Sequence, residues 1–357
     1  MHFAFTDEQA MIAETVSAFF AEHATSERTR GAMASREGID TALWQSFSTE
    51  LGLAGIQLPE EFGGASLGHV ELAIVAEAAG RHVAALPLVA SIALAAPAIL
   101  AGGSPPQRTN WLPRLASGER IATVAGLEPG ASLRCDGGRL AGLSPHVPHG
   151  QAADLFVIAA GGDLYLVERD APGLVVEPLV SMDQTRPYAR LTLRDVVGER
   201  LEDGERGIAA ATAAGCIVLA ADALGGAQAC LDRTVAYVNE RVQFGRTIGS
   251  FQAVKHRLAD MMVEVEQARS AVYWAACARD EEDAGAALAM HAAKAFATDA
   301  YQMCAGNMIQ LHGGIGFTWE HDAHLYFKRA RADATLLGTP AWHREQIAQL
   351  IGLDEAA

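Results

Sequence analysis

Positively charged residues are scarce in this sequence of 357 residues, which holds 27 Lys and Arg against 43 Asp and Glu. The formal net charge of −16 argues against a nucleic-acid partner, because proteins neutralise phosphate backbones with clustered Lys and Arg. Charged residues of either sign make up only 20% of the chain, and half of its residues are hydrophobic. This balance is ordinary for a packed, soluble enzyme, and the length predicts two or three domains.

Cysteine is also sparse, and its spacing argues against two kinds of site. The five cysteines contain no CxxC pair and no even framework, so neither a disulfide scaffold nor a metal site is expected. Thiols scattered in this way suit a reducing cytoplasm, where they act as small buried hydrophobes. We therefore expect a cytoplasmic protein without a bound metal. The five residues are Cys135, Cys216, Cys230, Cys277 and Cys304.

One long run, residues 83–107, lacks charged residues altogether. Its length exceeds that needed to cross a bilayer. Four prolines and a composition dominated by Ala argue against a membrane span, because Ala contributes little to insertion. We interpret the run as a buried helix with an extended entry. The prolines are Pro87, Pro97, Pro105 and Pro106.

The periodicity of the hydrophobic residues changes twice along the chain. Residues 1–118 follow helical spacing, and Thr6 and Gln9 stand at the distance of a capping box. Residues 119–203 are short β-rich runs separated by Gly, Pro and Asp, with a hairpin signal at Gly161-Gly-Asp163. Residues 204–357 return to helical spacing. The pattern predicts a mainly α protein with an N-terminal helical domain, a small antiparallel β domain and a C-terminal helical bundle.

Two segments at the ends of predicted helices, 241–252 and 310–317, suit a phosphate-bearing cofactor. Arg241 presents a fork of donors to an anion, and Gln252 stands near the positive dipole end of the next helix. The glycines of the second segment either cap a helix or let a backbone approach a pyrophosphate closely. A surface ion pair between Arg241 and a nearby carboxylate such as Asp232 is the alternative.

These motifs resemble the acyl-CoA dehydrogenase family, and the resemblance covers nearly the whole chain. Each piece is weak alone, but their combination in order and at suitable spacing is specific. The family implies an N-terminal helical domain, a middle β domain, a C-terminal four-helix bundle and FAD bound between subunits. The resemblance is carried by Phe5-Thr-Asp-Glu-Gln9, Leu58-Pro-Glu-Glu-Phe-Gly-Gly64, Arg241-Val-Gln-Phe-Gly245, Ile248-Gly-Ser-Phe-Gln252 and Gln310-Leu-His-Gly-Gly-Ile-Gly316.

The resemblance also implies contacts to the cofactor. Arg241 and Gln252 are expected to contact the FAD of a neighbouring subunit, and Phe244 is expected to pack on it. A second group is expected to line the cofactor's diphosphate and adenosine end or to lie beside it. This group comprises Gln310, Gly313, Gly314, Gly338 and Thr339.

The residue that removes the substrate's α-proton is missing from both places where the family keeps it. Members commonly carry a Glu directly before a Gly-Thr pair, where this chain has Leu337. Others carry it on the first helix of the bundle, where the matching position is Gly215. Leucine and glycine accept no proton. In the family the main-chain N–H of the base residue helps to polarise the thioester, and Leu337 retains that N–H.

Further departures point to an incomplete site. The Gly-Ser-Asp that usually follows a Glu-Pro pair reads Ala131-Ser-Leu133, residues 140–150 lack a Trp, and Pro340-Ala341 replaces a Gln that often contacts FAD. The chain therefore resembles the short subunit of two-subunit dehydrogenases, which are associated with sterol side chains, dicarboxylic acids or ring-bearing acyl groups. The resemblance implies an acyl-CoA substrate, a homologous subunit or a second copy as partner in a dimer or tetramer, and electron-transfer flavoprotein as electron acceptor.

Three hypotheses remain open at this point. The first is a subunit of a hetero-oligomer that completes FAD sites with a homologous partner but has no base of its own. The second is a self-sufficient homo-oligomer that uses Asp222, the single charge in a buried helical pattern two turns after Gly215, as an unusual base. The third is a non-enzymatic scaffold of the same fold. A structural role is the default for Asp222, because a buried carboxylate requires a partner.

Overall fold

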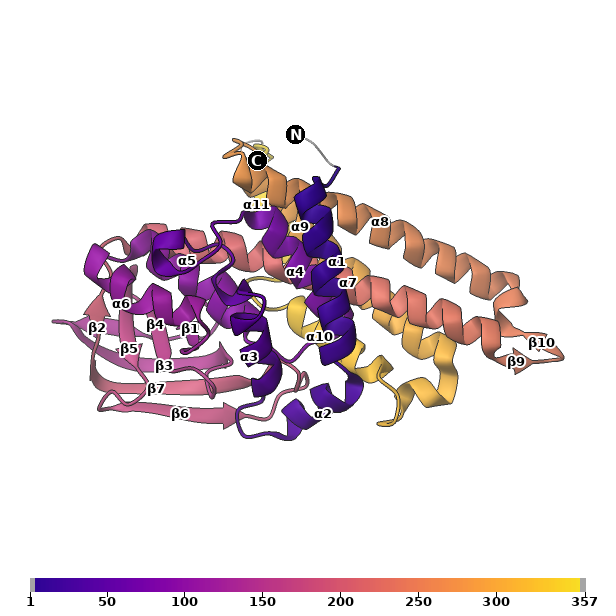
Figure 1. The fold of residues 1–357 in the computed structure, drawn as a ribbon, viewed down its shortest axis with the longest axis horizontal. Helices are drawn as coiled ribbons and strands as arrows, with labels where there is room; N and C mark the ends of the chain where they lie inside the picture. The colour runs from indigo at the N-terminus through magenta and orange to yellow at the C-terminus, as the bar shows by residue number, and fades with distance from the viewer. Residues whose placement is uncertain (1–3, 354–357) are drawn as a thin grey trace. The chain divides into compact units, whose positions relative to one another are not determined.

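The structure, a computed structural model, describes residues 4–353. Its contacts divide the described chain into two compact units. Unit 1 takes its residues from Met1–Ser26, His69–Ala84 and Cys216–Ala357, and unit 2 from Glu27–Gly68 and Ala85–Gly215. The element types confirm the predicted helix, strand, helix order (Figure 1). The three-domain division at 118 and 203 stays a prediction.

Unit 1 is built from long helices. Its elements are α1 (Asp7–His23), α4 (His69–Arg81), most of α7 (Gly204–Glu240), the short strands β9 (Val242–Gln243) and β10 (Arg246–Thr247), η4 (Ile248–Ser250), α8 (Gln252–Asp280), α9 (Ala286–His312), η5 (Gly313–Phe317), α10 (Ala323–Asp333) and α11 (Pro340–Leu350). Helix α9 packs on α8, α10 and α11, and α4 packs on α1 and α8.

Side-chain caps set the helix ends in unit 1. The predicted capping box is present, since the Gln9 N–H donates to Thr6 Oγ1 over 3.2 Å and the Thr6 N–H to Gln9 Oε1 over 3.0 Å. Helix α4 is capped from the end of α8, where the Asp280 carboxylate accepts from the N–H groups of His69 and Val70 at 2.7 and 3.0 Å. These donors, with the His69 ring, hold the pKa of Asp280 below its usual value although burial opposes them.

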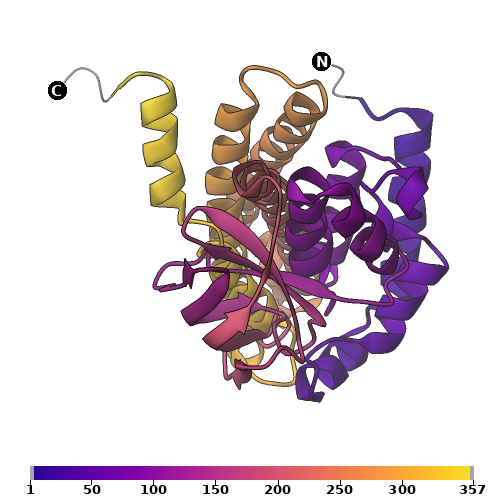
Figure 2. The same cartoon turned by 90° about the vertical axis from the view of Figure 1, so that its left-hand side faces the viewer.

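Unit 2 contains eight strands in two four-stranded sheets, which face the viewer in Figure 2. One sheet has the order β1 (Ala122–Ala125), β4 (Leu155–Ala160), β5 (Asp163–Glu168), β8 (Glu199–Arg200). The other has β2 (Arg134–Asp136), β3 (Arg139–Pro148), β7 (Tyr188–Val197), β6 (Leu174–Leu179). Buried residues of both sheets, among them Leu140, Phe156 and Leu191, form one core.

The helices of unit 2 are α2 (Ser26–Ala34), α3 (Thr41–Thr49), α5 (Ala96–Gly102) and α6 (Pro105–Ala116), with the short turns η1 (Leu53–Gly55) and η2 (Glu60–Phe62). The run 83–107 is buried and mostly helical, as predicted. Its entry continues into η3 (Leu88–Ala95), a π-helix rather than an α-helix, followed by α5.

The prediction of a purely antiparallel β domain is wrong in one pairing. Strand β1 pairs with β4 in parallel, with Ala122 opposite Leu155, so that sheet is mixed. The chain leaves β1, passes through β2 and β3 of the other sheet and returns to β4, which allows a parallel neighbour without a crossover helix. The predicted hairpin at 161–163 is confirmed, because Ala160 pairs with Asp163 across Gly161 and Gly162.

Among the described helices, only α7 is long and apolar enough to cross a membrane by length and composition. Its most apolar window has a mean hydropathy of 1.8, and 72% of that window is buried inside the protein. A buried core helix passes the same test. The apolar composition of α7 is thus explained by its burial inside the protein.

Candidate cofactor and thioester site

The ends of α7 and α9 lie side by side in unit 1. The rings of Tyr237 and His312 stack with their centroids 4.3 Å apart, and the Tyr237 hydroxyl donates to the His312 carbonyl over 3.3 Å. Tyr237 precedes Arg241 by one helical turn, and His312 directly precedes the glycines of η5. The structure therefore brings together the two segments that the sequence singled out as cofactor-binding. Sequence reasoning missed the Tyr237–His312 contact, for which the motifs contain no signal.

Arg241 is exposed and has no carboxylate partner among residues 4–353. The alternative of a pair with Asp232 is not observed, because Asp232 accepts from Arg81 Nη2 at 2.6 Å. Gln252, which begins α8, and Gln310 are also exposed. An unpaired guanidinium and exposed amides are donors suited to a diphosphate.

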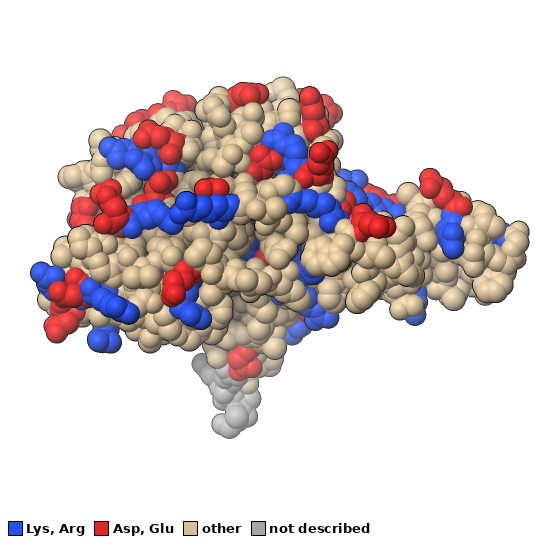
Figure 3. Space-filling view, turned by 90° about the horizontal axis from the view of Figure 1, so that it is seen from below, with Lys and Arg blue, Asp and Glu red and all other residues tan. Residues whose placement is uncertain are grey.

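The backbone around these residues is open. A Cβ added at Gly313 or Gly314 meets no atom within 4 Å, and Gly313 has φ +63° with ψ −139°, a conformation that suits only glycine. Phe244 also has a positive φ, +54°, and its side chain is 92% exposed. Figure 3 shows mostly uncharged surface on the arm at the right, where Figure 1 places the end of α7, the strands β9 and β10 and the start of α8.

A second group of expected residues lies on the turn between α10 and α11. Leu337 is half-buried and has φ +58°, a conformation that leucine rarely adopts, and Gly338 follows with φ +110°. Thr339 is the N-cap of α11, since the Trp342 N–H donates to its Oγ1 over 3.2 Å. Lys294 and His343, which the sequence analysis did not single out, lie directly against this turn.

The turn is remote from the Arg241 group within one chain. Lys294 contacts the turn, and His312 contacts the end of α7, yet the two residues stand 18 positions apart on the single helix α9. At a rise of 1.5 Å per residue they are about 27 Å apart. The expected contacts therefore form two separate groups on each chain.

The carboxylate that the sequence suggested as a substitute base, that of Asp222, is not available to accept a substrate proton. Gly215 is buried in α7. Asp222, the low-ranked candidate, is 5% exposed and accepts from Arg329 Nη1 at 3.1 Å. Arg329 also donates to the Ala84 carbonyl over 3.3 Å. This placement matches the structural role that the sequence analysis took as its default for Asp222.

Two further carboxylates also have structural environments. Glu128 caps a turn in unit 2, where its carboxylate accepts from the Ser144 hydroxyl and from the Gly126 N–H at 2.9 Å. Asp333 is fully buried at the end of α10.

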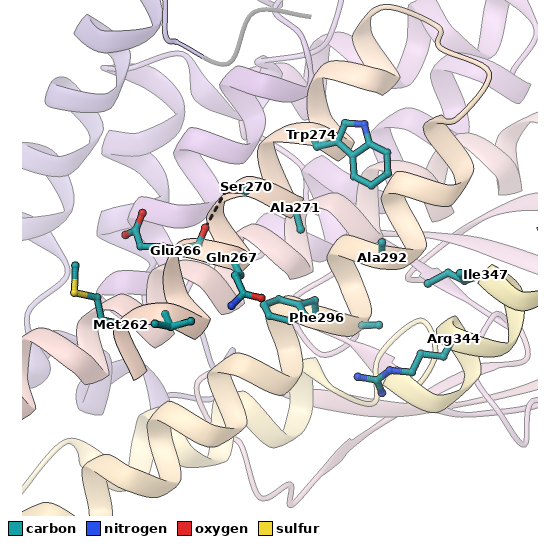
Figure 4. Close-up of a pocket in the computed structure, with 12 residues that line it drawn as sticks. Met262, Glu266, Gln267, Ser270, Ala271, Trp274, Ala292, Phe296, Arg344 and Ile347 are labelled. Atoms are coloured by element: carbon teal, nitrogen blue, oxygen red, sulfur yellow. Dashed lines mark hydrogen bonds between the residues drawn. The ribbon is translucent and has the colours of Figure 1, made fainter. Parts of the chain in front are cut away.

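A large groove in unit 1 is a different feature. It holds about 960 Å³, is bordered by α8, α9 and α11, and is mainly apolar. Figure 4 shows Trp274 and Phe296 at this groove, with Arg344 and Ile347 reaching it from α11. No residue expected to bind the cofactor lines it, so its size does not identify it as the site of chemistry.

Comparison with known families decides the class of protein. The description "Acyl-CoA dehydrogenase, N-terminal domain" matches residues 6–119, and "Acyl-CoA dehydrogenase, C-terminal domain" matches residues 181–352. The chain belongs to the acyl-CoA dehydrogenase family. Members of this family are FAD-dependent oxidoreductases, so the expected enzyme class and cofactor are confirmed at that level.

Relatives and solved structures match almost the full length. The acyl-CoA dehydrogenase IpdE2 of Mycolicibacterium smegmatis is 38% identical over 346 residues, which cover 97% of this chain and 98% of that protein. A chain in the structure of the ChsE4–ChsE5 complex from Mycobacterium tuberculosis matches with a TM-score of 0.92 at 29% identity. The match covers 100% of this chain and 100% of that chain. A Tcur3481–Tcur3483 steroid acyl-CoA dehydrogenase variant has a TM-score of 0.89 at 33% identity and covers 98% of this chain and 99% of that one.

The residues present fit FAD at the end of α7 and α9. The fit rests on the unpaired Arg241 and on the open backbone at Gly313 and Gly314, which leaves room for a diphosphate. When bound, the flavin supplies the hydride-accepting group of the reaction.

Proposed function

We propose that this chain is a subunit of a heteromeric FAD-dependent acyl-CoA dehydrogenase, that it lacks a catalytic base, and that it completes FAD sites with a homologous partner. The observation that carries the proposal is the turn at Leu337. Its strained backbone and its N–H are retained, while the side chain that should remove the α-proton is aliphatic. The partner is expected to supply the carboxylate.

The separation of the two groups on α9 supports a shared site. His312, which contacts the end of α7, lies about 27 Å along α9 from Lys294, which contacts the Gly338 turn. Each chain thus presents two half-sites, and a second subunit that turns its own half-site toward each would complete both. The ChsE4–ChsE5 complex, one chain of which has the same fold over its whole length, carries two subunit names.

The roles of this chain's residues follow from the chemistry. Arg241 and Gln252 bind the anionic part of the cofactor, and the Leu337 N–H donates to the thioester carbonyl, which makes the α-carbon more acidic. Proton removal requires a base within hydrogen-bond reach, which Leu337 and Gly215 do not provide. The buried Asp222–Arg329 pair argues against a self-sufficient enzyme that uses Asp222.

The substrate class to test first is a steroid-derived acyl-CoA. A steroid acyl-CoA dehydrogenase matches 98% of this chain. Electron-transfer flavoprotein is the proposed electron acceptor, and a structure named for that flavoprotein from Acidaminococcus fermentans matches 99% of this chain at a TM-score of 0.89. A cytoplasmic location is part of the proposal and accords with five free cysteines.

The test is co-expression with a homologous acyl-CoA dehydrogenase subunit from the same source, followed by a flavin count and by bleaching of the flavin absorbance with a steroid-derived acyl-CoA. The chain alone is expected to bleach no flavin, and the complex is expected to bleach one flavin per completed site. Stoichiometric FAD and bleaching by the chain alone, lost in Asp222→Asn, would support the self-sufficient enzyme instead. A complex without flavin absorbance would support the scaffold.

A further inference from the structure

A buried positive charge, that of Lys294, lies beneath the Leu337 turn and belongs to none of the sequence motifs described above. Lys294 lies in α9 with its side chain fully buried. Its Nζ donates to the Asp333 carbonyl over 2.8 Å and to the Gly338 carbonyl over 3.3 Å. A buried ammonium group is costly unless it is hydrogen-bonded, so a Lys at this position needs these main-chain acceptors. It joins the end of α10 to Gly338, two residues before the start of α11.

The turn is also held from the side of α11. A Cβ at Gly338 would meet the Trp342 ring at 2.5 Å and His343 Nε2 at 3.1 Å, so only glycine fits between them. The His343 N–H donates to the Thr339 carbonyl over 3.0 Å. His343 is fully buried, and its Nδ1 lies 2.7 Å from Nδ1 of His291.

These contacts determine which way one backbone donor, the Thr339 N–H, faces. In a planar trans peptide the N–H points away from the carbonyl of the preceding residue. Because Lys294 draws the Gly338 carbonyl inward, the Thr339 N–H faces the opposite side. Within residues 4–353 no acceptor is found for the N–H groups of Leu337, Gly338 or Thr339, whereas the carbonyls of Gly338 and Thr339 are bonded.

We propose that Lys294 is a positioning residue that holds the 333–339 turn, so that its free N–H groups face the cofactor and the thioester. The identity of the ligands in this inference rests on the proposed function, whereas the role of Lys294 in holding the turn does not. The strain at Leu337 persists because Lys294 and α11 fix the backbone on both sides of it.

The test compares Lys294→Met, which keeps the length and loses the donors, with Thr298→Val on the same helix one turn later. Thr298 is fully buried too, but its hydroxyl bonds only within α9. The first readout is the crystal structure of each variant without ligand. In Lys294→Met the Leu337 φ is expected to leave the positive region or the Gly338 carbonyl to rotate, whereas Thr298→Val keeps the turn. An unchanged turn in Lys294→Met overturns the proposal.

The second readout is FAD binding by the partner complex, followed by flavin fluorescence. Lys294→Met is expected to weaken binding at least tenfold, and Thr298→Val less than twofold.

Gly338→Ala displaces the same turn directly, so its effect and that of Lys294→Met should be less than additive in the double variant. Additive effects, or equal losses in Lys294→Met and Thr298→Val, would mean that Lys294 only stabilises the fold. If the wild-type complex binds no FAD, the proposed function fails while the crystal structures still decide the role of Lys294.

Discussion

At the scale of single residues, a substitution of Arg241 should change FAD affinity while leaving the stability of the fold nearly unchanged. Its guanidinium is exposed and unpaired within the described chain, so Arg241→Gln should change the free energy of unfolding by less than about 0.5 kcal/mol. A charge-assisted hydrogen bond contributes about 1.5–3 kcal/mol, so FAD affinity in the partner complex should fall by roughly 10- to 150-fold. Fluorescence titration measures this loss. Arg257→Gln, which removes a hydrogen bond to Asn307 on the protein surface, is the control and should bind FAD normally.

Asp222 should be essential for stability. Removing one partner of the buried Asp222–Arg329 pair leaves the other charge uncompensated, so Asp222→Asn should lower the free energy of unfolding by about 3–5 kcal/mol. The matched control is Asp232→Asn on the same helix, whose pair with Arg81 is nearly half exposed and should contribute less than about 1 kcal/mol. Urea titrations of both variants measure the difference. Equal losses would contradict the structural role assigned to Asp222.

The residues that could be predicted from the sequence are those with a local signature. Arg241 before a Phe-Gly break and the glycines after His312 stand out because charge and backbone freedom are readable residue by residue. Lys294 is the single Lys or Arg of the Ala-rich helix α9, but its acceptors lie 39 and 44 residues away. Contacts over that span depend on packing, which periodicity does not encode.

At the scale of elements, the capping box of α1 was predictable because it needs residues only three positions apart. Thr6→Ala removes the acceptor for the Gln9 N–H and should cost about 1 kcal/mol of local helix stability. Hydrogen exchange of the first-turn amides of α1 should accelerate about fivefold, while that of α9 stays unchanged. Thr6→Ser keeps the hydroxyl and serves as the control. Uniform acceleration in both helices would contradict a local effect.

The parallel pairing of β1 with β4 was not predictable in the same way. Both strands show the expected β-rich composition, and β4 with β5 follows the hairpin rule across Gly161 and Gly162. The direction in which β1 joins depends on the path through β2 and β3, which belong to the other sheet. Composition identifies a strand, but its neighbours are set by the whole β unit.

At the scale of the whole molecule, buried histidines couple stability to pH. Burial, and then the nearby Lys294 and His291, lower the pKa of His343 from 6.5 to about 3. Burial, and then Arg81 and Arg233, lower the pKa of half-buried His82 to about 4. The unfolded chain takes up these protons near pH 6.5, whereas the folded chain resists them until about pH 3–4. The contribution of both groups is therefore complete above pH 6.5 and is lost as the pH falls below it.

The free energy of unfolding should accordingly fall between pH 6.5 and pH 4. For His343, which is fully buried, the loss reaches about 2 kcal/mol at pH 5. Urea unfolding measured at pH 7.5, 6 and 5 tests this.

His343→Gln removes the titrating group. The stability of this variant should therefore vary less steeply with pH, by about one bound proton, even if its absolute stability is lower. His82→Gln should show a smaller effect of the same sign, because solvent screens a half-exposed ring. Identical slopes for the wild type and both variants would show that neither ring is held neutral by the fold.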